Sequence, residues 1–248
     1  MKLQVLIATM HQTDDSLLRT MNIQSDAVVC NQCEHHAIRE YTHHGHRILW
    51  WDDTGRGLSR NRNFALLLAE ADIGLLADDD VIYEDGYAER ICDAFRRFPE
   101  ADVILFEVRG ANGTIPRVMR IRWYNALRWG SVRMAFRIHR VQQCGIAFHL
   151  GFGAGTPRGY GEDTLFLNAC LRRGLTVLAV PVTVAALSNE RPSTWFRGYD
   201  TTYLQNKGAL FRELSPRCAW MLCLQDAVRH RRQYRLPWYR AYRLMRGE

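Results

Sequence analysis

The stretch GLSRNRNFALLLAEADIGLLADDD, residues 57–80, decides the fold because it reads as one helix followed directly by one strand. Apolar residues recur at helical spacing from Ser59, which we expect as the N-cap, to Ala71. Residues 73–77 are then an apolar, strand-like run that ends on Asp78. A helix that leads into a buried strand is part of the repeating unit from which parallel sheets are built.

The same alternation continues on both sides of this stretch. Short runs rich in Val, Ile, Leu and Trp predict strands at residues 3–9, 26–30, 48–51 and 103–108. An amphipathic pattern predicts a second helix over 87–98, which Pro99 stops. The second half is less regular, with strand patterns at 134–138, 146–150 and 175–180 and a helix pattern at 163–173. We therefore expect an α/β fold with a Rossmann-like, mostly parallel central sheet flanked by helices.

Length and composition indicate one soluble α/β body with an appendage. The chain has 248 residues, of which 47% are hydrophobic and 24% charged. No apolar run approaches the ~20 residues that span a bilayer. The apolar start at residues 3–9 is too short for a secretory signal. We expect a mature N-terminus and a cytoplasmic location. Peripheral attachment to the inner face of the membrane is compatible with that location.

The seven cysteines include a single C-x-x-C pair, Cys30 and Cys33. No second pair with zinc-ribbon spacing follows, so reduced thiols in a cytosolic protein are the favoured interpretation, and a structural zinc site is the alternative. Five histidines lie between residues 35 and 46, but their spacing matches no metal motif, which favours a solvated loop.

The formal net charge is +7, with a sequence pI near 9.2. Much of this charge lies in residues 229–246, where seven arginines are interleaved with Tyr234, Trp238, Tyr239 and Tyr242. Such a mixture suits an anionic membrane surface or a polyanion, and a solvated helical tail is the alternative. We expect a helical, basic C-terminal extension over 201–248.

Three adjacent carboxylates, Asp78, Asp79 and Asp80, follow the strand at 73–77. Adjacent carboxylates repel one another, and a divalent cation at the carboxyl edge of the sheet would relieve that repulsion. Their hard oxygen atoms suit Mg²⁺ or Mn²⁺, which bind protein carboxylates together with substrate phosphates. The alternative is a solvated acidic turn that caps a helix near Glu84.

The segment GLSRNRN at 57–63 changes this balance, because it opens the helix that leads into the acidic strand. A helix N-terminus with Ser, Arg and Asn side chains favours an anion such as phosphate. The path from residue 57 to residue 80 can bring basic groups and carboxylates to one edge of the sheet. A diphosphate and a metal ion would then share a site.

At this point the sequence resembles family 2 glycosyltransferases, which have the GT-A fold. Arg62-Asn63 fall on the Arg-Asn pair of the family's Gly-x-Ser-x-x-Arg-Asn helix, and Asp78 and Asp80 fall on its Asp-x-Asp positions. A later Glu-Asp pair of the family matches Glu162-Asp163, which Phe166 follows three positions on. The resemblance covers residues 3–190. Residues 193–196 and 207–209 also look like the C-terminal part of bacterial polysaccharide-type members.

The resemblance implies an inverting, metal-dependent transfer of a sugar from a nucleotide-diphosphate donor to an acceptor hydroxyl. It makes Asp163 the catalytic base, with Glu162 in support, and Asp78 and Asp80 the ligands of Mg²⁺ or Mn²⁺. Donor contacts are assigned to Thr9, Asn31, Ser59, Arg62, Asn63, Asp78 and Asp79.

One departure concerns the nucleobase. Many members end the second strand with an Asp that contacts the base or ribose, whereas this chain has Asn31, which carries no charge. Asp52 and Asp53 after the third strand are the alternative, although a turn-forming role is favoured for them.

The expected organisation is a catalytic domain over 1–200, with a nucleotide-sugar half at 1–110 and an acceptor half at 111–200. Five glycines within 151–161 predict a loop on the acceptor side that bends closely or moves. The donor is a UDP-, GDP- or dTDP-sugar, the acceptor is a saccharide or lipid-linked saccharide, and the setting is cell-surface polysaccharide or glycolipid synthesis. We expect no nucleic acid as a partner.

Two other functions remain open from the residues alone. A basic nucleic-acid-binding module would explain the charge, but the carboxylates would repel phosphate. A nucleotidyltransferase would share the sheet and metal site, but residues 10–13 lack a glycine-rich phosphate loop. Ser59 has no nearby His and Asp in a hydrolase arrangement, which disfavours nucleophilic catalysis.

Overall fold

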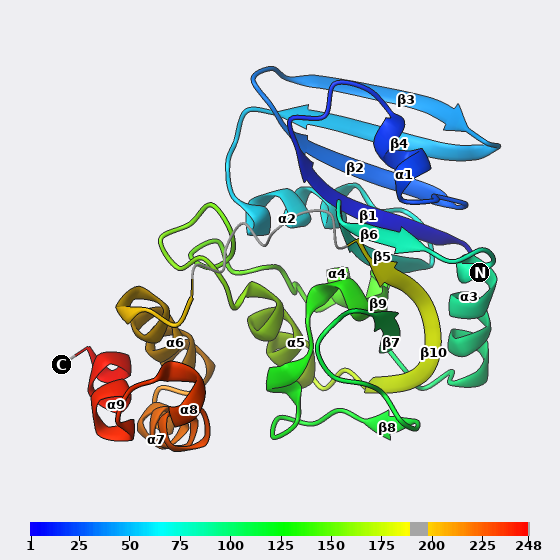
Figure 1. Cartoon of the computed structure of the whole chain (residues 1–248). Helices are drawn as coiled ribbons and strands as arrows, with labels where there is room; N and C mark the ends of the chain where they lie inside the picture. Colours follow the sequence, from blue (N-terminus) through cyan, green and yellow to red (C-terminus); the bar gives the residue numbers. More distant parts are fainter. Residues whose placement is uncertain (189–197, 248) are drawn as a thin grey trace.

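A ten-stranded mixed sheet forms the centre of the protein in this computed structural model, which describes residues 1–188 and 198–247 (Figure 1). The strand order is β3-β4-β2-β1-β5-β9-β7-β10-β6, and β8 pairs with β10. The strands are β1 (Leu3–Met10), β2 (Asp26–Gln32), β3 (Ala37–His43), β4 (His46–Asp53), β5 (Ile73–Asp78), β6 (Val81–Tyr83), β7 (Val103–Arg109), β8 (Met119–Arg120), β9 (Met134–Arg137) and β10 (Val177–Leu187).

The central strands run parallel, which aligns their carboxyl ends. β1 lies between β2 and β5, and β2 also pairs with β4 in parallel. The register places Thr9 beside Asn31 and Ala8 beside Asp78. Next along the edge, Asn31 lies beside Asp52. The polar residues that the sequence placed after separate strands therefore meet at one edge of the sheet.

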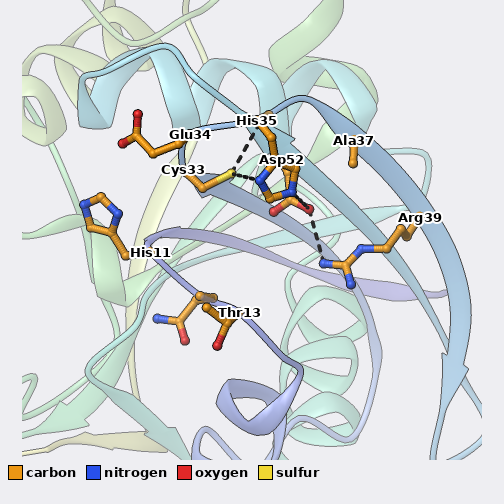
Figure 2. Close-up of a pocket in the computed structure, with 9 residues that line it drawn as sticks. His11, Thr13, Cys33, Glu34, His35, Ala37, Arg39 and Asp52 are labelled. Atoms are coloured by element: carbon orange, nitrogen blue, oxygen red, sulfur yellow. Dashed lines mark hydrogen bonds and ion pairs between the residues drawn. The ribbon is translucent and has the colours of Figure 1, made fainter.

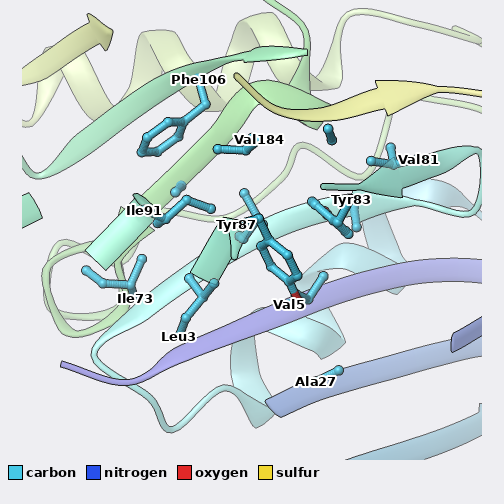
Figure 3. Close-up of a cluster of buried hydrophobic side chains, with 14 of the residues drawn as sticks. Leu3, Val5, Ala27, Ile73, Val81, Tyr83, Tyr87, Ile91, Phe106 and Val184 are labelled. Carbon is cyan, nitrogen blue, oxygen red and sulfur yellow. The ribbon is translucent and has the colours of Figure 1, made fainter. Parts of the chain in front are cut away.

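Two layers of helices cover the sheet, each over its own hydrophobic core. α1 (Ser16–Thr20) and α3 (Tyr87–Arg97) pack on one face, where Tyr87, Ile91 and Phe95 join the core (Figure 3). α2 (Leu58–Leu68), α4 (Ile138–Gln143) and α5 (Glu162–Arg172) cover the other face. The short helices η1 (Ala126–Arg128) and η2 (Ser131–Arg133) precede β9. Burial on both faces explains why β1 and β5 read as continuous apolar runs.

Four helices after residue 200 share a third core of their own. They are α6 (Thr201–Leu214), α7 (Ala219–Arg229), α8 (Arg231–Tyr234) and α9 (Trp238–Arg246). Tyr234 and Met245 are buried in this core, which also contains Phe152 of the glycine-rich loop. Trp238 and Tyr239, in contrast, are about half exposed. The segment is thus helical and packed through one face, and Pro237 separates α8 from α9 as the N-cap of α9.

Several local expectations need correction. Gly57, not Ser59, is the N-cap of α2. The histidine-rich segment is not a solvated loop, because β3 and β4 form an antiparallel hairpin in which His43 is buried. Residues 146–150 form no strand. Asp52 and Asp53 belong to β4 and are buried, so neither forms a turn.

Residues 193–196, in which we saw a likeness to polysaccharide-type members, lie outside the described residues. The expected boundary at residue 200 falls immediately before α6. Within residues 1–188 and 198–247, no helix combines the length and the apolar character needed to cross a bilayer.

Candidate active site

The carboxyl ends of β1 and β5 place the acidic cluster beside the first strand. The Thr9 hydroxyl donates to Oδ2 of Asp79 at 2.9 Å and accepts from Nε2 of Gln12 at 3.0 Å. Asp78, the last residue of β5, is 31% exposed. The hydrogen bonds of Thr9 therefore fix Asp79 against the end of β1, while Asp78 remains accessible.

Helix α2 carries the GLSRNRN segment under the glycine-rich loop. The Ser59 hydroxyl donates to the carbonyl of Phe152 at 2.6 Å, and the Leu58 N–H donates to the carbonyl of Ala154 at 2.9 Å. Ser59 is fully buried. This start of the helix therefore holds the 151–161 loop in place, a contact that the sequence pattern did not predict.

Close packing of that loop depends on Gly153. Its φ is +103°, which favours glycine. A Cβ there would lie 3.0 Å from the Ser59 hydroxyl and 3.2 Å from Cδ of Glu162. The loop backbone therefore touches both α2 and the first residue of α5.

Arg62 is a buried guanidinium at the centre of the site. Its Nη2 donates to Asp78 Oδ1 at 2.6 Å and to the Ser131 hydroxyl at 2.8 Å, and its Nη1 donates to Glu162 Oε1 at 3.0 Å. The guanidinium also lies over the ring of Phe148, 5.4 Å from its centroid. Burial disfavours its charge, but Asp78 and Glu162 outweigh that effect and raise the pKa of Arg62. Arg62 thus joins the strand-end carboxylate to the Glu-Asp pair.

Glu162 and Asp163 begin α5 and face this cation. Burial raises the pKa of Glu162 to about 7, the charge of Asp163 adds to the rise, and Arg62 opposes it. Burial also raises the pKa of Asp163, although Arg62 and the backbone N–H groups of Thr164 and Ser131 act to lower it. Both carboxyls therefore bind a proton more readily than a solvated carboxylate, which suits a group that must accept one.

Asn63 and Asn31 form part of the framework. The Asn63 side chain donates to the carbonyl of Phe148 at 2.9 Å and accepts from its N–H at 2.7 Å. The Asn31 amide donates to the carbonyl of Gln12 and to Asp52, and it accepts from the Gln12 N–H. Both N–H groups of the Asn31 side chain thus donate hydrogen bonds within the protein. The contacts of Asn31 and Asn63 with the nucleotide sugar stay predictions.

An open cavity of about 480 Å³ lies at the ends of β1, β2 and β4 (Figure 2). Gln12, Arg39 and Asp52 line it, together with His11, Thr13, Cys33, Glu34, His35 and Ala37. Gln12 also contacts Thr9, so hydrogen bonds connect the cavity to Asp79. Sequence reasoning missed Gln12 and Arg39, and the only signal for Gln12 was its place just after the first strand.

Asp52 is the buried carboxylate of this cavity. Burial alone would favour its protonated form, but hydrogen bonds from Asn31 and Trp50 and the charge of Arg39 together hold its pKa below the ordinary value. Arg39 Nη2 lies 3.2 Å from Asp52 Oδ2. The cavity therefore presents a fixed negative group and a cation beside it.

The sequence also matches a known family. The model of glycosyl transferase family 2 matches residues 33–164, just over half of the chain. The chain belongs to the family 2 glycosyltransferases. This membership favours a glycosyltransferase over the nucleic-acid-binding module and the nucleotidyltransferase.

Solved structures agree in fold. The Staphylococcus aureus TarS fragment 1–349 superposes with a TM-score of 0.61 at 13% identity, over 100% of this chain and 91% of that one. The same fragment in complex with UDP-GlcNAc gives 0.60 at 13% identity, with the same coverage. Its complex with UDP gives 0.60 at 17% identity, over 94% of this chain and 72% of that one. No protein with a curated description matches the chain.

Within this family 2 glycosyltransferase, the GT-A sheet brings Asp78 and Glu162 to one buried cation although they lie far apart in the sequence. The oxygen atoms of Asp78 and Asp80 have the hard character that Mg²⁺ and Mn²⁺ prefer, and the Asp78 side chain is partly exposed and thus accessible to an ion. The chemistry of these residues therefore fits the expected metal.

Proposed function

We propose that this protein is an inverting, metal-dependent glycosyltransferase that uses a nucleotide-diphosphate sugar. One observation carries the proposal: Arg62 holds Asp78, at the end of β5, and Glu162, at the start of α5, on the two sides of one guanidinium. A metal-binding carboxylate and an acid-base pair in one site are what such a transfer requires.

The donor would lie along the carboxyl edge of the sheet. Its nucleoside fits the cavity beside Gln12 and Asp52, and its diphosphate then lies toward the acidic cluster. Mg²⁺ or Mn²⁺ bound by Asp78 and Asp80 would offset the charge of the departing nucleoside diphosphate. UDP-sugars are the first donors to test, because the similar TarS fragment was solved with UDP-GlcNAc and with UDP.

Asp163 would act on the acceptor. As the acceptor oxygen attacks the anomeric carbon, its proton passes to the Asp163 carboxylate, and the bond from that carbon to the donor phosphate oxygen breaks. Attack opposite the leaving group inverts the anomeric centre. Glu162 would hold Arg62 in place, and its own pKa is raised by its burial and by the neighbouring charge of Asp163.

The direct test measures release of nucleoside diphosphate from a panel of sugar nucleotides with Mn²⁺ or Mg²⁺. A thermal-shift screen of the same donors gives binding independently of the acceptor, because a ligand that binds the folded state stabilises it. Turnover, or metal-dependent stabilisation by one donor, supports the proposal. If the folded protein neither binds nor consumes any sugar nucleotide, the proposal is wrong.

We further propose that the enzyme attaches peripherally to an anionic membrane through its C-terminal helices, as an enzyme of cell-surface polysaccharide or glycolipid synthesis would. Arg235, Arg240 and Arg243 are exposed, and Trp238 and Tyr239 beside them are about half exposed. Arginine near an anionic surface contributes about 1 kcal/mol per residue, and half-exposed aromatic rings suit the interface.

Vesicle co-sedimentation tests this attachment. Binding should require anionic lipid, weaken with salt and fall when Trp238 and Tyr239 are both changed to alanine. Ile38→Ala is the control, because Ile38 is 62% exposed on β3, far from α9 (Figure 1). Binding to neutral vesicles alone, or none at low salt, would contradict the attachment and leave the transferase proposal untouched.

A further inference from the structure

Three side chains of different chemistry converge at the mouth of the cavity (Figure 2). Cys33 follows β2, His35 precedes β3, and Asp52 lies near the end of β4. One ligand atom from each lies within 4.8 Å of the other two. Cys33 Sγ is 3.6 Å from Nδ1 of His35, and Nε2 of His35 is 3.5 Å from Oδ2 of Asp52.

These separations match those of ligands around a small cation. Zinc binds sulfur at about 2.3 Å and nitrogen or oxygen at about 2.0–2.2 Å, so neighbouring ligands of a tetrahedral ion lie roughly 3.5 Å apart. At present each nitrogen of His35 faces one partner. The His35 side chain is 64% exposed, so its ring is free to turn one nitrogen toward both.

Asp52 is already oriented as a ligand. Its Oδ1 accepts from Nδ2 of Asn31 at 2.7 Å and from Nε1 of Trp50 at 2.8 Å. These bonds direct Oδ2 toward His35 and Arg39. Protein ligands of metals commonly have such supporting hydrogen bonds, which fix the carboxylate before the ion arrives.

We propose that Cys33, His35 and Asp52 bind a thiophilic divalent cation of the Zn²⁺ type. Cys33 would lose its thiol proton to solvent and bind as the thiolate, and Arg39 would move away from Asp52. Three protein ligands leave a fourth position for water. This site differs in chemistry from the all-oxygen site at Asp78 and Asp80.

The Cys30–Cys33 pair does not provide the alternative zinc site considered from the sequence. Cys30 is completely buried in the core beneath α2, whereas Cys33 faces the cavity. The second and third ligands come instead from His35 and Asp52, which the C-x-x-C spacing could not reveal.

Occupation of this site would block the cavity. This consequence rests on the proposed function, which places the donor nucleoside there. The cation and the nucleoside would then exclude each other, so zinc would inhibit the enzyme, and a zinc-selective chelator added with excess Mg²⁺ would restore its activity.

Titration with Co²⁺ alone tests the site. A thiolate ligand gives a sulfur-to-cobalt charge-transfer band, which an all-oxygen site cannot give. We expect the band in the wild type and its loss in Cys33→Ser and His35→Ala. The controls His36→Ala and Cys218→Ser should keep it, because His36 is 66% exposed and pairs with Asp53, and Cys218 is an exposed thiol. Absence of the band, or its persistence in folded Cys33→Ser, overturns the proposal.

Arg39→Gln gives an effect of opposite sign. It removes the cation that lies 3.2 Å from Oδ2 of Asp52, so Co²⁺ should bind severalfold more tightly. Weaker or unchanged binding would contradict the assignment of Asp52. A competition with UDP then tests whether the donor nucleoside occupies the same cavity. If Co²⁺ binds but UDP does not displace it, the proposed metal site is supported and the proposed position of the nucleoside is wrong.

Discussion

Nη2 of Arg62 lies 2.6 Å from Oδ1 of Asp78, sixteen residues later in the chain. Arg62 belongs to α2 and Asp78 ends β5. The contact therefore joins the helix and the strand that the sequence predicts over residues 57–80. The other amino group of Arg62, Nη1, donates to Glu162, which lies one hundred residues after Arg62 in the chain. A single side chain therefore sets the distance between the two groups of carboxylates.

Replacing Arg62 by Met should lower the free energy of unfolding by roughly 3–5 kcal/mol, the usual result of removing one partner of a buried ion pair. The variant leaves Glu162 buried without its cation. Urea denaturation measures the loss. Arg47→Met is the matched control, because Arg47, Glu40 and Glu70 are all exposed and such pairs contribute at most about 1 kcal/mol. Equal losses in both variants would show that Arg62 has no special structural role.

Asp163→Asn should reduce transfer by roughly 10²-fold or more, the scale expected when a general base is removed. Donor binding should stay near normal, because Asp163 is assigned to the acceptor. Single-turnover rates and donor titration separate the two effects. Full turnover in this variant would exclude Asp163 as the base, whatever the family.

Asp80→Asn should behave differently from Asp163→Asn. It removes a negative oxygen from the expected metal site, so metal-dependent donor binding should weaken as well as turnover. The measurement is donor affinity at increasing Mn²⁺, where the variant should need more metal. If donor binding does not depend on metal in the wild type either, the metal assignment is wrong.

Glu162 predicts a pH dependence of stability. Its pKa is about 7 in the folded protein and 4.5 in its ordinary state. Between these values the folded state binds more protons than the unfolded chain, so the free energy of unfolding falls as pH rises. The difference in that free energy, wild type minus Glu162→Gln, should decrease from pH 4.5 to pH 7 and level off above. A difference that rises with pH would show that Arg62 overcomes the burial.

Gly208→Ala should destabilise the C-terminal helices by about 1–3 kcal/mol, the usual cost of overpacking. A Cβ at Gly208 of α6 would overlap the carbonyl oxygen of Met245 in α9. Gly159→Ala is the control, because nothing lies within 4 Å of a Cβ there and its φ is not positive. Thermal unfolding of the two variants gives the comparison. Equal melting temperatures would mean that α6 and α9 do not pack so closely in solution.

The centre of the sheet was predictable because β1, β2 and β5 are buried along nearly their whole length and are rich in apolar residues. β1, β2, β4 and β5 begin within two residues of the predicted strands, and the register then brings their polar ends together. β3 was missed because it is an edge strand with one exposed face, and its sequence, AIREYTH, shows little apolar continuity. The pattern at 146–150 was misleading, because only Ile146 and Phe148 join the core, without strand pairing, and Leu150 is exposed.

The sequence singled out the carboxylates of the candidate site, whose roles stay predictions, but it did not show which side chains contact them. Nothing in the run GLSRNRN shows that Arg62 points inward to acids rather than outward to phosphate, because only the fold places Glu162 beside it. The same holds for Ser59, whose hydroxyl binds the glycine-rich loop. Long-range partners of this kind are set by tertiary packing, which a local pattern does not record.

The amide of Asn31 is committed to the backbone of Gln12 and to Asp52, whereas His11 and Glu34 are exposed at the edge of the same cavity. Asn31 is thus part of the structural framework beside the cavity, whereas His11 and Glu34 belong to its exposed edge. A change at Asn31 would break hydrogen bonds that join the strand ends, whereas changes at His11 or Glu34 would leave those bonds intact. If the donor nucleoside binds in this cavity as proposed, a mutant library confined to His11 and Glu34 should keep most members folded while varying which nucleotide they accept.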